Sequence, residues 1–477
     1  MTAERGLHLG NFWDEKTKRF GGQHTFEGEQ HAIVFGPTGT GKTTRFLMVD
    51  LLSDCLDDRS VIVIDPKGEL AAVTAKHRHG LRGHDVKILD PFGKLHDAVK
   101  DKPDVYRYLL ENGLTQSAGF NPLAVLDQNS PDFYDDAAAI GEALIKIEGS
   151  EPHWSESAQG LITGLIMWEK LQNGRRASLE NVRALLTQAD RYEDALDEDG
   201  KRYSELASGL RMTARQMVKE GGYEIASLAG RFTRATDEIA SIVSTGDTQT
   251  RWLLSPRVRA DLRKEPGIDF AQLKKRPTTV YVILPAERMR THSVWLRLVI
   301  VSALRALYRP GGLRTMILID EMATLGHLKP LEDAFGLVRG YRIQIAGFVQ
   351  DLGQLKSLYH DRWESFMANA GVVQGFAAND LFTADWMSRR AGQATIVAKG
   401  ISHTLGQAPR GGTESDSESW HQVSRAKFLP QELFGFERGT GLLWLAGLAD
   451  SVKFSAPQYF EIPLCKSRAL PNPYAEG

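Results

Sequence analysis

The chain has little cysteine: Cys55 and Cys465 are its only 2 cysteines among 477 residues, and they lie far apart. They form no CxxC pair, which argues against a disulfide scaffold and against a structural zinc site. This cysteine usage fits a reducing compartment, so we expect a cytoplasmic protein.

An excess of charge of one sign and a long apolar run are also missing. The 58 basic and 60 acidic residues give a formal charge of −2, so no global field would hold nucleic acid non-specifically. A nucleic-acid site must therefore be a local patch or one created by assembly. No signal-peptide run opens the sequence, and no uncharged window reaches the length of a membrane span. The most apolar long helix candidate, from Val294, contains Arg297 and Arg305, so we expect a buried amphipathic helix there.

What the chain does contain is an alternation of short β-branched runs and helical patterns. Such alternation predicts an α/β fold with a mainly parallel sheet that helices cover on both faces. The length of 477 residues also exceeds the usual size of a single domain. The predicted strands span residues 31–35, 60–64, 86–89, 279–284, 315–319, 342–348 and 371–376.

The character of the sequence changes after the third predicted strand. Residues 132–244 are rich in Ala, Leu, Glu and Arg at helical spacing, with no convincing strand, and they predict an inserted all-α domain. The α/β domain is then formed by residues 1–131 and 245–477. Within its second part, residues 400–424 are rich in Gly and Ser and lack periodicity, which predicts a mobile loop.

A phosphate-binding sequence of the form GxxxxGKS/T follows the first predicted strand and precedes a helix that begins near Lys42. The residues of this loop and the threonine after it are Gly36, Pro37, Thr38, Gly39, Thr40, Gly41, Lys42, Thr43 and Thr44. Glycines let the backbone wrap around phosphate oxygens at a helix N-terminus. Lys42 would reach the β- and γ-phosphates, and Thr43 would place its hydroxyl on Mg²⁺. We therefore expect ATP and Mg²⁺ as cofactors and a nucleotide-binding role for the α/β domain. A turn that matches by chance is the alternative, which the flanking strand and helix disfavour.

An apolar strand ends in two adjacent carboxylates, Asp320 and Glu321. In a nucleotide site Asp320 would hold the Mg²⁺ shell, and Glu321 would accept a proton from the attacking water. The alternative is a solvated turn or a helix cap. A glutamate next to the aspartate is typical of hydrolytic motors, not of kinases or of GTPases that position water with Gln. It favours the RecA-like and AAA-like motor class, and we expect a RecA-like P-loop NTPase.

Two further side chains are candidates for the same site. Gln350 ends the next predicted strand, where it could touch the γ-phosphate and report its loss. Phosphoryl transfer also needs a cation against the developing charge, and this is often an arginine from a neighbouring subunit. Arg339 is the candidate for that role, with Arg342 as the alternate.

Several segments together resemble the type IV secretion coupling proteins, the TraG/TraD-like ATPases of bacterial conjugation. The first group of segments is Asp65-Pro66-Lys67-Gly68-Glu69-Leu70, Asp90-Pro91-Phe92 and Asn121-Pro122-Leu123. The second group is Leu318-Ile319-Asp320-Glu321-Met322-Ala323-Thr324-Leu325-Gly326, then Gln350-Asp351-Leu352-Gly353-Gln354-Leu355 with Tyr359, and Asn369. The resemblance covers about residues 31–459, and the combination is far more specific than any one piece.

The resemblance implies an ATP-driven motor that recruits single-stranded DNA with its relaxase, or a protein effector, and delivers it to a type IV secretion channel. It also implies a ring, a hexamer when active, whose all-α domain receives the substrate. It carries over Lys42, Thr43, Asp320, Glu321 and Gln350 as nucleotide-site residues, and Arg339 as the arginine that acts in trans. For Asp65, Lys67 and Glu69 the family supports a structural or site-supporting role, whereas sequence chemistry alone would leave them as a helix-start cap.

The sequence departs from the family in one respect, because members usually begin with transmembrane helices and none is evident here. Two explanations stay open: a member that a membrane-anchored partner recruits to the inner membrane face, or a chain that begins after its membrane segment. Two other functions also stay open. One is a cytoplasmic double-stranded DNA translocase of the FtsK or HerA kind, and the other is a docking adaptor that binds ATP without motor activity.

Overall fold

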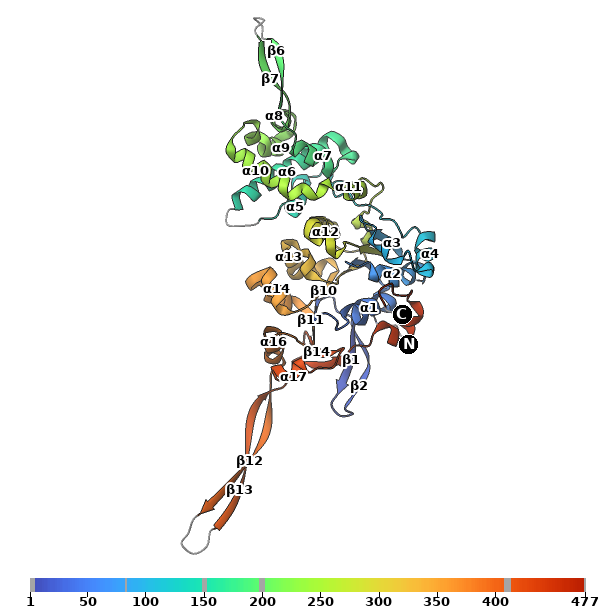
Figure 1. Cartoon of the computed structure of the whole chain (residues 1–477), viewed down its shortest axis with the longest axis vertical. Coiled ribbons are helices and arrows are strands. Elements are labelled where there is room, and N and C mark those ends of the chain that lie inside the picture. Colours follow the sequence, from blue (N-terminus) through green and yellow to red (C-terminus); the bar gives the residue numbers. More distant parts are fainter. Residues whose placement is uncertain (1–4, 82–83, 148–151, 197–201, 407–412, 476–477) are drawn as a thin grey trace.

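The computed structural model describes residues 5–81, 84–147, 152–196, 202–406 and 413–475. Its centre is an 11-stranded sheet with the order β2-β1-β15-β14-β11-β3-β10-β9-β4-β8-β5. Figure 1 shows a helical part at one end of the long axis and a thin β-hairpin at the other end.

The strands predicted from the sequence form the parallel part of this sheet, from β11 to β5. They are β3 (His31–Phe35), β4 (Arg59–Ile64), β5 (Asp85–Leu89), β8 (Thr278–Val282), β9 (Arg314–Ile319), β10 (Ile343–Val349) and β11 (Ala370–Phe376). The predicted α/β fold with a mainly parallel sheet is therefore confirmed.

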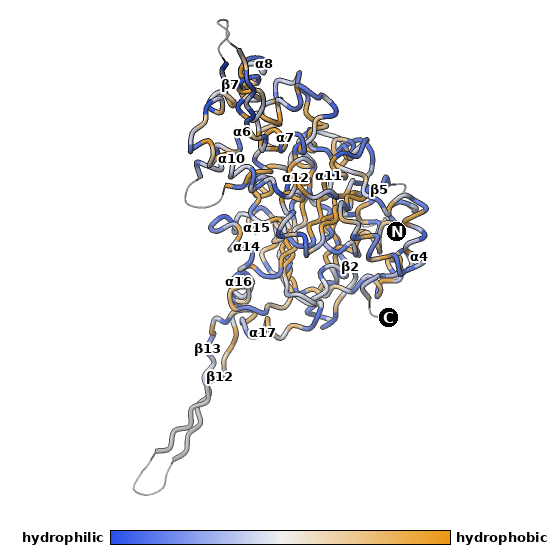
Figure 2. The backbone as a smooth tube through the Cα atoms, turned by 45° about the horizontal axis from the view of Figure 1, so that its top comes forward, coloured by the Kyte–Doolittle hydropathy of each residue, from blue (hydrophilic) through white to orange (hydrophobic). Residues whose placement is uncertain are grey.

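The alternation of side chains along β9 shows how this sheet builds two cores. Met316 and Leu318 belong to one buried cluster, and Ile317 and Ile319 belong to the other. Successive side chains of a strand point to opposite faces, so a strand with apolar residues at every position needs cover on both sides. Figure 2 shows the apolar residues gathered along these central strands.

Helices supply that cover on both faces. Packed with Met316 and Leu318 are residues of α1 (Met48–Leu52), α2 (Glu69–Lys76), α3 (Lys94–Val99), α4 (Pro103–Glu111) and α18 (Pro463–Arg468). The other cluster contains residues of α12 (Ala286–Leu307), α13 (Lys329–Leu337), α14 (Leu352–Tyr359), α15 (Trp363–Asn369) and α16 (Leu381–Ala391). The long apolar helix expected from Val294 is the second half of α12, and its Arg297 is buried.

One side of the sheet was not expected from the sequence. Four antiparallel strands continue it beyond β11 in the order β14 (Thr440–Leu445), β15 (Val452–Ser455), β1 (Leu7–Asp14) and β2 (Arg19–Phe26). β2 contains two adjacent glycines and is largely exposed, so it lacks the alternation by which a half-buried strand is recognised.

The helical part lies between β5 and β8 in the chain and packs on α12 through α5. Its helices are α5 (Phe133–Leu144), α6 (Pro152–Asn173), α7 (Leu179–Leu186), α8 (Leu210–Glu220), α9 (Gly222–Ala229), α10 (Asp237–Thr250) and α11 (Pro256–Leu262). The expectation that residues 132–244 contain no strand is wrong, because β6 (Arg191–Leu196) and β7 (Arg202–Ser208) form an antiparallel hairpin there. The boundaries 132 and 244 stay a prediction.

The prediction that residues 400–424 form a loop is also wrong. β12 (Gln393–Gly406) pairs with β13 (Thr413–Ala426) in register from Gln393–Ala426 to Gly406–Thr413. The composition of these residues does not indicate strand pairing. β-Branched residues occur near the start of β12, whereas Gly, Ser and Glu dominate in the rest of the hairpin. Residues 407–412 of the predicted loop lie outside the described residues. The hairpin projects from the body below α16 and α17 (Pro430–Phe434) in Figure 1.

Among the described residues, no helix has both the length and the apolar character that crossing a bilayer requires.

Candidate nucleotide-binding site

The phosphate-binding loop joins the C-terminal end of β3 to a helix that opens with a π-helical turn (Thr43–Leu47) and continues as α1. Gly39 and Gly41 both have a φ of 85°, in the left-handed region that favours glycine. At Gly36 an added Cβ would lie 2.8 Å from the Cβ of Phe376 on β11. Glycine is therefore required at these positions by the turn and by close packing.

The Lys42 ammonium lies over this loop. Its Nζ donates hydrogen bonds to the carbonyl oxygens of Gly36 and of Pro37, the second at 3.3 Å. Burial lowers the pKa of Lys42 from its ordinary value, while the carboxylates of Glu321 and Asp320 oppose that shift. The structure thus brings the predicted lysine and the predicted acidic pair to one place.

Thr43 and Asp320 are in direct contact although they are 277 positions apart in the sequence. The Thr43 hydroxyl donates to Asp320 Oδ1 at 2.9 Å. A hydroxyl and a carboxylate are the oxygen ligands that Mg²⁺ accepts, and Mg²⁺ commonly keeps waters and substrate phosphates as its other ligands. No group of three or more metal-binding side chains occurs among the described residues. The residues present therefore fit a Mg²⁺ ion shared with a nucleotide better than a metal held by protein alone.

The electrostatics of Asp320 support the same assignment. Burial raises the pKa of Asp320 to about 6, and the negative charges of Glu69 and Glu321 act in the same direction. The hydrogen bond from Thr43 and the charge of Lys67 oppose this rise. A cation bound beside Asp320 would favour the ionised carboxylate.

Glu321 and Gln350 form a second contact, which joins the ends of the neighbouring strands β9 and β10. β9 and β10 are paired in parallel, and Gln350 Nε2 donates to Glu321 Oε2 at 3.0 Å. Burial raises the pKa of the Glu321 carboxyl, while the hydrogen bond from Gln350 and the charge of Lys42 lower it. A carboxylate with a raised pKa is a better proton acceptor at neutral pH than an exposed one.

A cavity of about 250 Å³ opens beside these groups. It lies between the phosphate-binding loop and the loops that follow β10 and β11, and its wall includes Gly36, Thr38, Gln350, Asn379 and Asp380. In parallel α/β sheets, ligands bind at the carboxyl ends of the strands. The cavity therefore lies at the ligand-binding end of the sheet, beside the first residues of the phosphate-binding loop.

Two residues of this region, Arg45 and Gln458, were missed by the sequence analysis. The Arg45 guanidinium donates to the carbonyl oxygens of Thr40, at 3.2 Å, and of Ala456. The Thr44 hydroxyl donates to Gln458 Oε1 at 3.3 Å. The C-terminal segment thus holds the first turn after the phosphate-binding loop through hydrogen bonds. These contacts could not be predicted, because the partners are more than 400 positions apart in the sequence.

The DPKGEL segment, residues 65–70, lies close to the acidic pair. The Asp65 carboxylate accepts hydrogen bonds from the backbone N–H groups of Glu69 at 3.1 Å and of Ala71 at 2.9 Å, which caps α2. Glu69 Oε1 accepts from Asn472 Nδ2 at 2.7 Å. Burial raises the pKa of Asp65 to about 7, and the charge of Asp320 adds to that rise. These contacts are those of a supporting element next to the acidic pair.

The other family segments also lie at element ends. Asp90 Oδ2 accepts from the Leu95 N–H at 2.8 Å at the start of α3. Asn121 Nδ2 donates to the Ala177 carbonyl at 3.0 Å, and its Oδ1 accepts from the Leu123 N–H at 3.0 Å. Asn121 therefore fastens the chain where it enters the helical part.

The arginine candidates lie at the N-terminal end of β10, opposite the strand ends that carry the nucleotide site. Arg339 falls in the 3-10 turn Val338–Tyr341, which precedes β10, and its side chain lies outside the described part of the structure. Arg342 also precedes β10, and its Nη1 donates to the Gly312 carbonyl at 3.1 Å. Since β10 has 7 residues, this edge is about 20 Å from the phosphate-binding loop. The backbone of both arginines therefore lies at the end of β10 opposite the phosphate-binding loop.

A family model described as "Type IV secretory system Conjugative DNA transfer" matches residues 6–475. The conjugal transfer protein TraG of Escherichia coli is 24% identical over 98% of this chain and 73% of the relative. The type IV secretion system-coupling protein VirD4 of Bartonella henselae is 27% identical over 85% of this chain and 59% of that protein.

Solved structures show the same fold. The bacterial conjugative coupling protein TrwBdeltaN70 has a TM-score of 0.63 at 14% identity and covers 96% of this chain and 95% of that chain. The plasmid coupling protein TrwB with the non-hydrolysable ATP analogue ADPNP has a TM-score of 0.61 at 14% identity, with the same coverage. The family model spans nearly the whole chain. The chain belongs to the type IV secretory system conjugative DNA-transfer family.

Proposed function

We propose that this chain is an ATP-driven coupling motor that recruits a DNA or protein substrate and passes it to a type IV secretion channel. The observation that carries this proposal is a pair of contacts at the carboxyl ends of the parallel strands, Thr43 to Asp320 and Glu321 to Gln350. In this proposal Lys42 is the phosphate-binding group, Thr43 and Asp320 are the oxygen ligands, Glu321 is the base and Gln350 is the polar sensor. The names of the relatives, conjugal transfer protein and coupling protein, support the same function.

In this proposal each residue of the site has one role. The loop N–H groups and Lys42 bind the phosphates of ATP, and Thr43 with Asp320 orients them through Mg²⁺, which neutralises charge on the phosphates. Glu321 accepts a proton from water, and Gln350 holds the Glu321 carboxylate in place. TrwB structures with ADPNP and with ADP and Mg²⁺ support these cofactors.

The position of Arg339 supports hydrolysis in an assembly. The backbone of Arg339 lies before β10, at the strand end opposite its own phosphate-binding loop, and we propose that this arginine serves the site of another copy. A ring, as in the hexamer that the family resemblance implies, would bring this edge of one subunit toward the nucleotide of the next. An arginine supplied in this way contributes about 10³ to 10⁵ in rate.

The proposed partners follow from the family and from the shape of the molecule. The helical part stands at one end of the long axis, apart from the nucleotide site (Figure 1). We assign residues 132–244 to recognition of single-stranded DNA with its relaxase, or of a protein effector. Components of the secretion channel, and a membrane-anchored partner that recruits the motor to the inner membrane face, complete the proposal.

The test is ATP turnover by the purified chain with single-stranded DNA, with duplex DNA and without DNA. A coupling motor hydrolyses ATP, and single-stranded DNA raises the rate. Stimulation by duplex DNA alone would favour a translocase of the FtsK or HerA kind. Tight ATP binding with no turnover under any condition, including protein concentrations that give rings, would favour the docking adaptor.

A further inference from the structure

Two leucines of this chain are unusually exposed. Leu337 and Leu381 are 72% and 69% exposed, the highest values among the leucines that the structure describes. Single apolar residues on a surface are common and need no partner. These two differ from the others because each lies beside one half of the proposed hydrolysis machinery, the nucleotide site or the arginine.

Leu381 lies at the rim of the cavity of about 250 Å³ beside the phosphate-binding loop, here called the nucleotide cavity. It opens α16 between Asp380 and Thr383, which both line that cavity, and its neighbour Phe382 is 37% exposed. The Thr383 N–H donates to Asp380 Oδ1 at 2.8 Å, so the helix is capped at this point. The rim of the cavity is therefore an apolar surface in a fixed position.

The nucleotide cavity itself carries negative charge. Asp351 and Asp380 line it, and its described lining residues include no lysine or arginine. Each carboxylate caps a helix through Oδ1, and neither forms an ion pair with another described residue. A surface that combines exposed apolar residues with such carboxylates suits a partner that presents apolar and basic side chains.

The second exposed leucine belongs to a segment of that composition. Leu337 ends α13, and Arg339, Tyr341 and Arg342 follow before β10 begins. Tyr341 is 36% exposed. Arg342 is also exposed, its Nη1 donates to a backbone carbonyl at 3.1 Å, and it forms no ion pair with another described residue. Residues 337–342, the arginine segment, therefore offer apolar and basic groups together.

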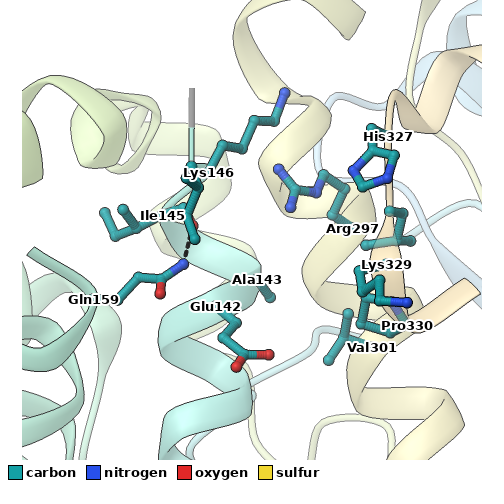
Figure 3. A pocket seen from close by; sticks show the side chains of 12 residues that line it. Glu142, Ala143, Ile145, Lys146, Gln159, Arg297, Val301, His327, Lys329 and Pro330 are labelled. Atoms are coloured by element: carbon teal, nitrogen blue, oxygen red, sulfur yellow. Dashed lines mark hydrogen bonds between the residues drawn. The ribbon is translucent and has the colours of Figure 1, made fainter. Parts of the chain in front are cut away.

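The arginine segment is held in place at both ends. The side chain of Phe335 buries the end of α13, and Figure 3 shows Pro330 in the first turn of that helix beside Val301 of α12. At the other end Arg342 has a φ of 57°, in a region that residues other than glycine seldom adopt. Its carbonyl accepts from the Thr315 N–H of β9 at 3.0 Å. The segment is thus presented in one conformation between α13 and the sheet.

The arginine segment and the rim of the cavity cannot meet within one chain. The segment precedes β10, whereas the nucleotide cavity lies at the other end of this strand of 7 residues, about 20 Å away. Two different surfaces at opposite ends of one body pair only between copies, and contacts of this head-to-tail kind close into rings.

We propose that the arginine segment of one copy packs on Leu381 and Phe382 of the next copy, and that it brings its positive charge to the nucleotide cavity. Leu337 and Tyr341 supply the apolar part of this contact. The proposed function places Arg339 at the site of another copy without saying which surfaces meet. The contact rests on that function, and the partner that fits the rim is a second copy of this chain.

Cross-linking tests the contact directly, because the two cysteines of the chain, Cys55 and Cys465, are both buried. Leu337→Cys and Leu381→Cys are combined in one chain, which is mixed with ADPNP, Mg²⁺ and an oligothymidylate and then treated with a short bismaleimide. The matched control combines Leu381→Cys with Leu110→Cys, at a leucine of α4 that is 51% exposed. The single-cysteine variants complete the set.

We expect the double variant to give a ladder of products at multiples of the chain mass, because every copy carries both halves of the contact. The single variants and the Leu110→Cys control should give single chains and dimers only. A ladder from the double variant that is no longer than that of the control would overturn the proposal.

Leu337→Glu and Leu381→Glu test the same contact through activity, because each places a carboxylate in the apolar surface. Both variants should stay single chains at concentrations where wild type assembles. Their turnover should fall by about 10³ or more, the contribution of an arginine supplied by another subunit. The dissociation constant of ATP should change less than about twofold, and Leu110→Glu should behave as wild type.

A rescue separates loss of the contact from loss of folding. Leu337→Lys and Leu381→Glu combined in one chain place opposite charges across the contact, so this variant should regain assembly and turnover. Assembly of both single glutamate variants at wild-type concentrations would overturn the proposal.

The contact and the proposed motor fail in different ways. A ladder in a chain that hydrolyses no ATP under any condition would refute the motor and leave the contact standing. Turnover that DNA stimulates, in an assembly that gives no ladder, would leave the motor standing and remove the contact.

Discussion

Glu321→Gln isolates the step that we assign to the base. In the variant the carboxamide oxygen can still accept the hydrogen bond that Gln350 Nε2 makes at 3.0 Å to Glu321 Oε2. The contacts of Lys42 and of Thr43 with Asp320 do not involve the Glu321 side chain. The site therefore keeps its shape and its phosphate-binding groups, and it loses a group that can accept a proton.

A positioned base contributes about 10² to 10⁴ in rate, which corresponds to about 3 to 5 kcal/mol of activation free energy. We expect phosphate release to fall by that factor, while the dissociation constant of ATP, measured by equilibrium titration, changes less than threefold or so. Glu364→Gln, at an exposed carboxylate on α15, serves as the matched control and should turn over normally. A Glu321→Gln protein that hydrolyses ATP at the wild-type rate would refute the assignment of the base.

Four further predictions follow from the same structure. Lys42→Ala should lose ATP binding as well as turnover, and equilibrium titration of the variant beside Glu321→Gln separates the two defects. Gln350→Ala removes a hydrogen bond that lowers the pKa of Glu321, so the acid limb of the kcat/KM profile should move to higher pH; a limb that stays in place would count against the contact. Arg339→Ala subunits mixed with Lys42→Ala subunits should regain part of the turnover that each lacks alone, and a mixture as inactive as its components would argue against an arginine acting in trans. Burial raises the pKa of Asp50 to about 8, above its value in the unfolded chain, so the native state holds this proton more tightly. The free energy of unfolding should therefore fall as pH rises from about 4 to about 8. Asp50→Asn should flatten the dependence of the unfolding midpoint on pH.

The parallel half of the sheet was predictable from the sequence for a physical reason. Strands such as β4 and β9 are buried on both faces. Their sequences therefore contain uninterrupted runs of β-branched and aliphatic residues. The four antiparallel strands of this sheet and the separate β12–β13 hairpin were not predictable in this way. β2 is mostly exposed, and the outer half of β13 is built from Ser, Glu and Asp, so neither carries the pattern by which strands are recognised.

The candidate site was likewise predictable only in part. Lys42, Thr43, Asp320, Glu321 and Gln350 follow strand ends in the sequence, and parallel pairing brings those ends together. Contacts made by the C-terminal segment could not be anticipated. The link of Asn472 to Glu69 joins residues 403 positions apart, and nothing in local composition marks either partner. The roles of the site residues stay predictions until their variants are assayed.

ATP turnover measured against the concentration of single-stranded DNA, at protein concentrations from below to above ring formation, tests the central claim most directly. A coupling motor with this site should show little phosphate release as an isolated subunit, a steep rise on assembly, and a further rise with DNA that Lys42→Ala abolishes. Phosphate release that is the same with and without DNA at every protein concentration, or that persists in Lys42→Ala, would contradict the account.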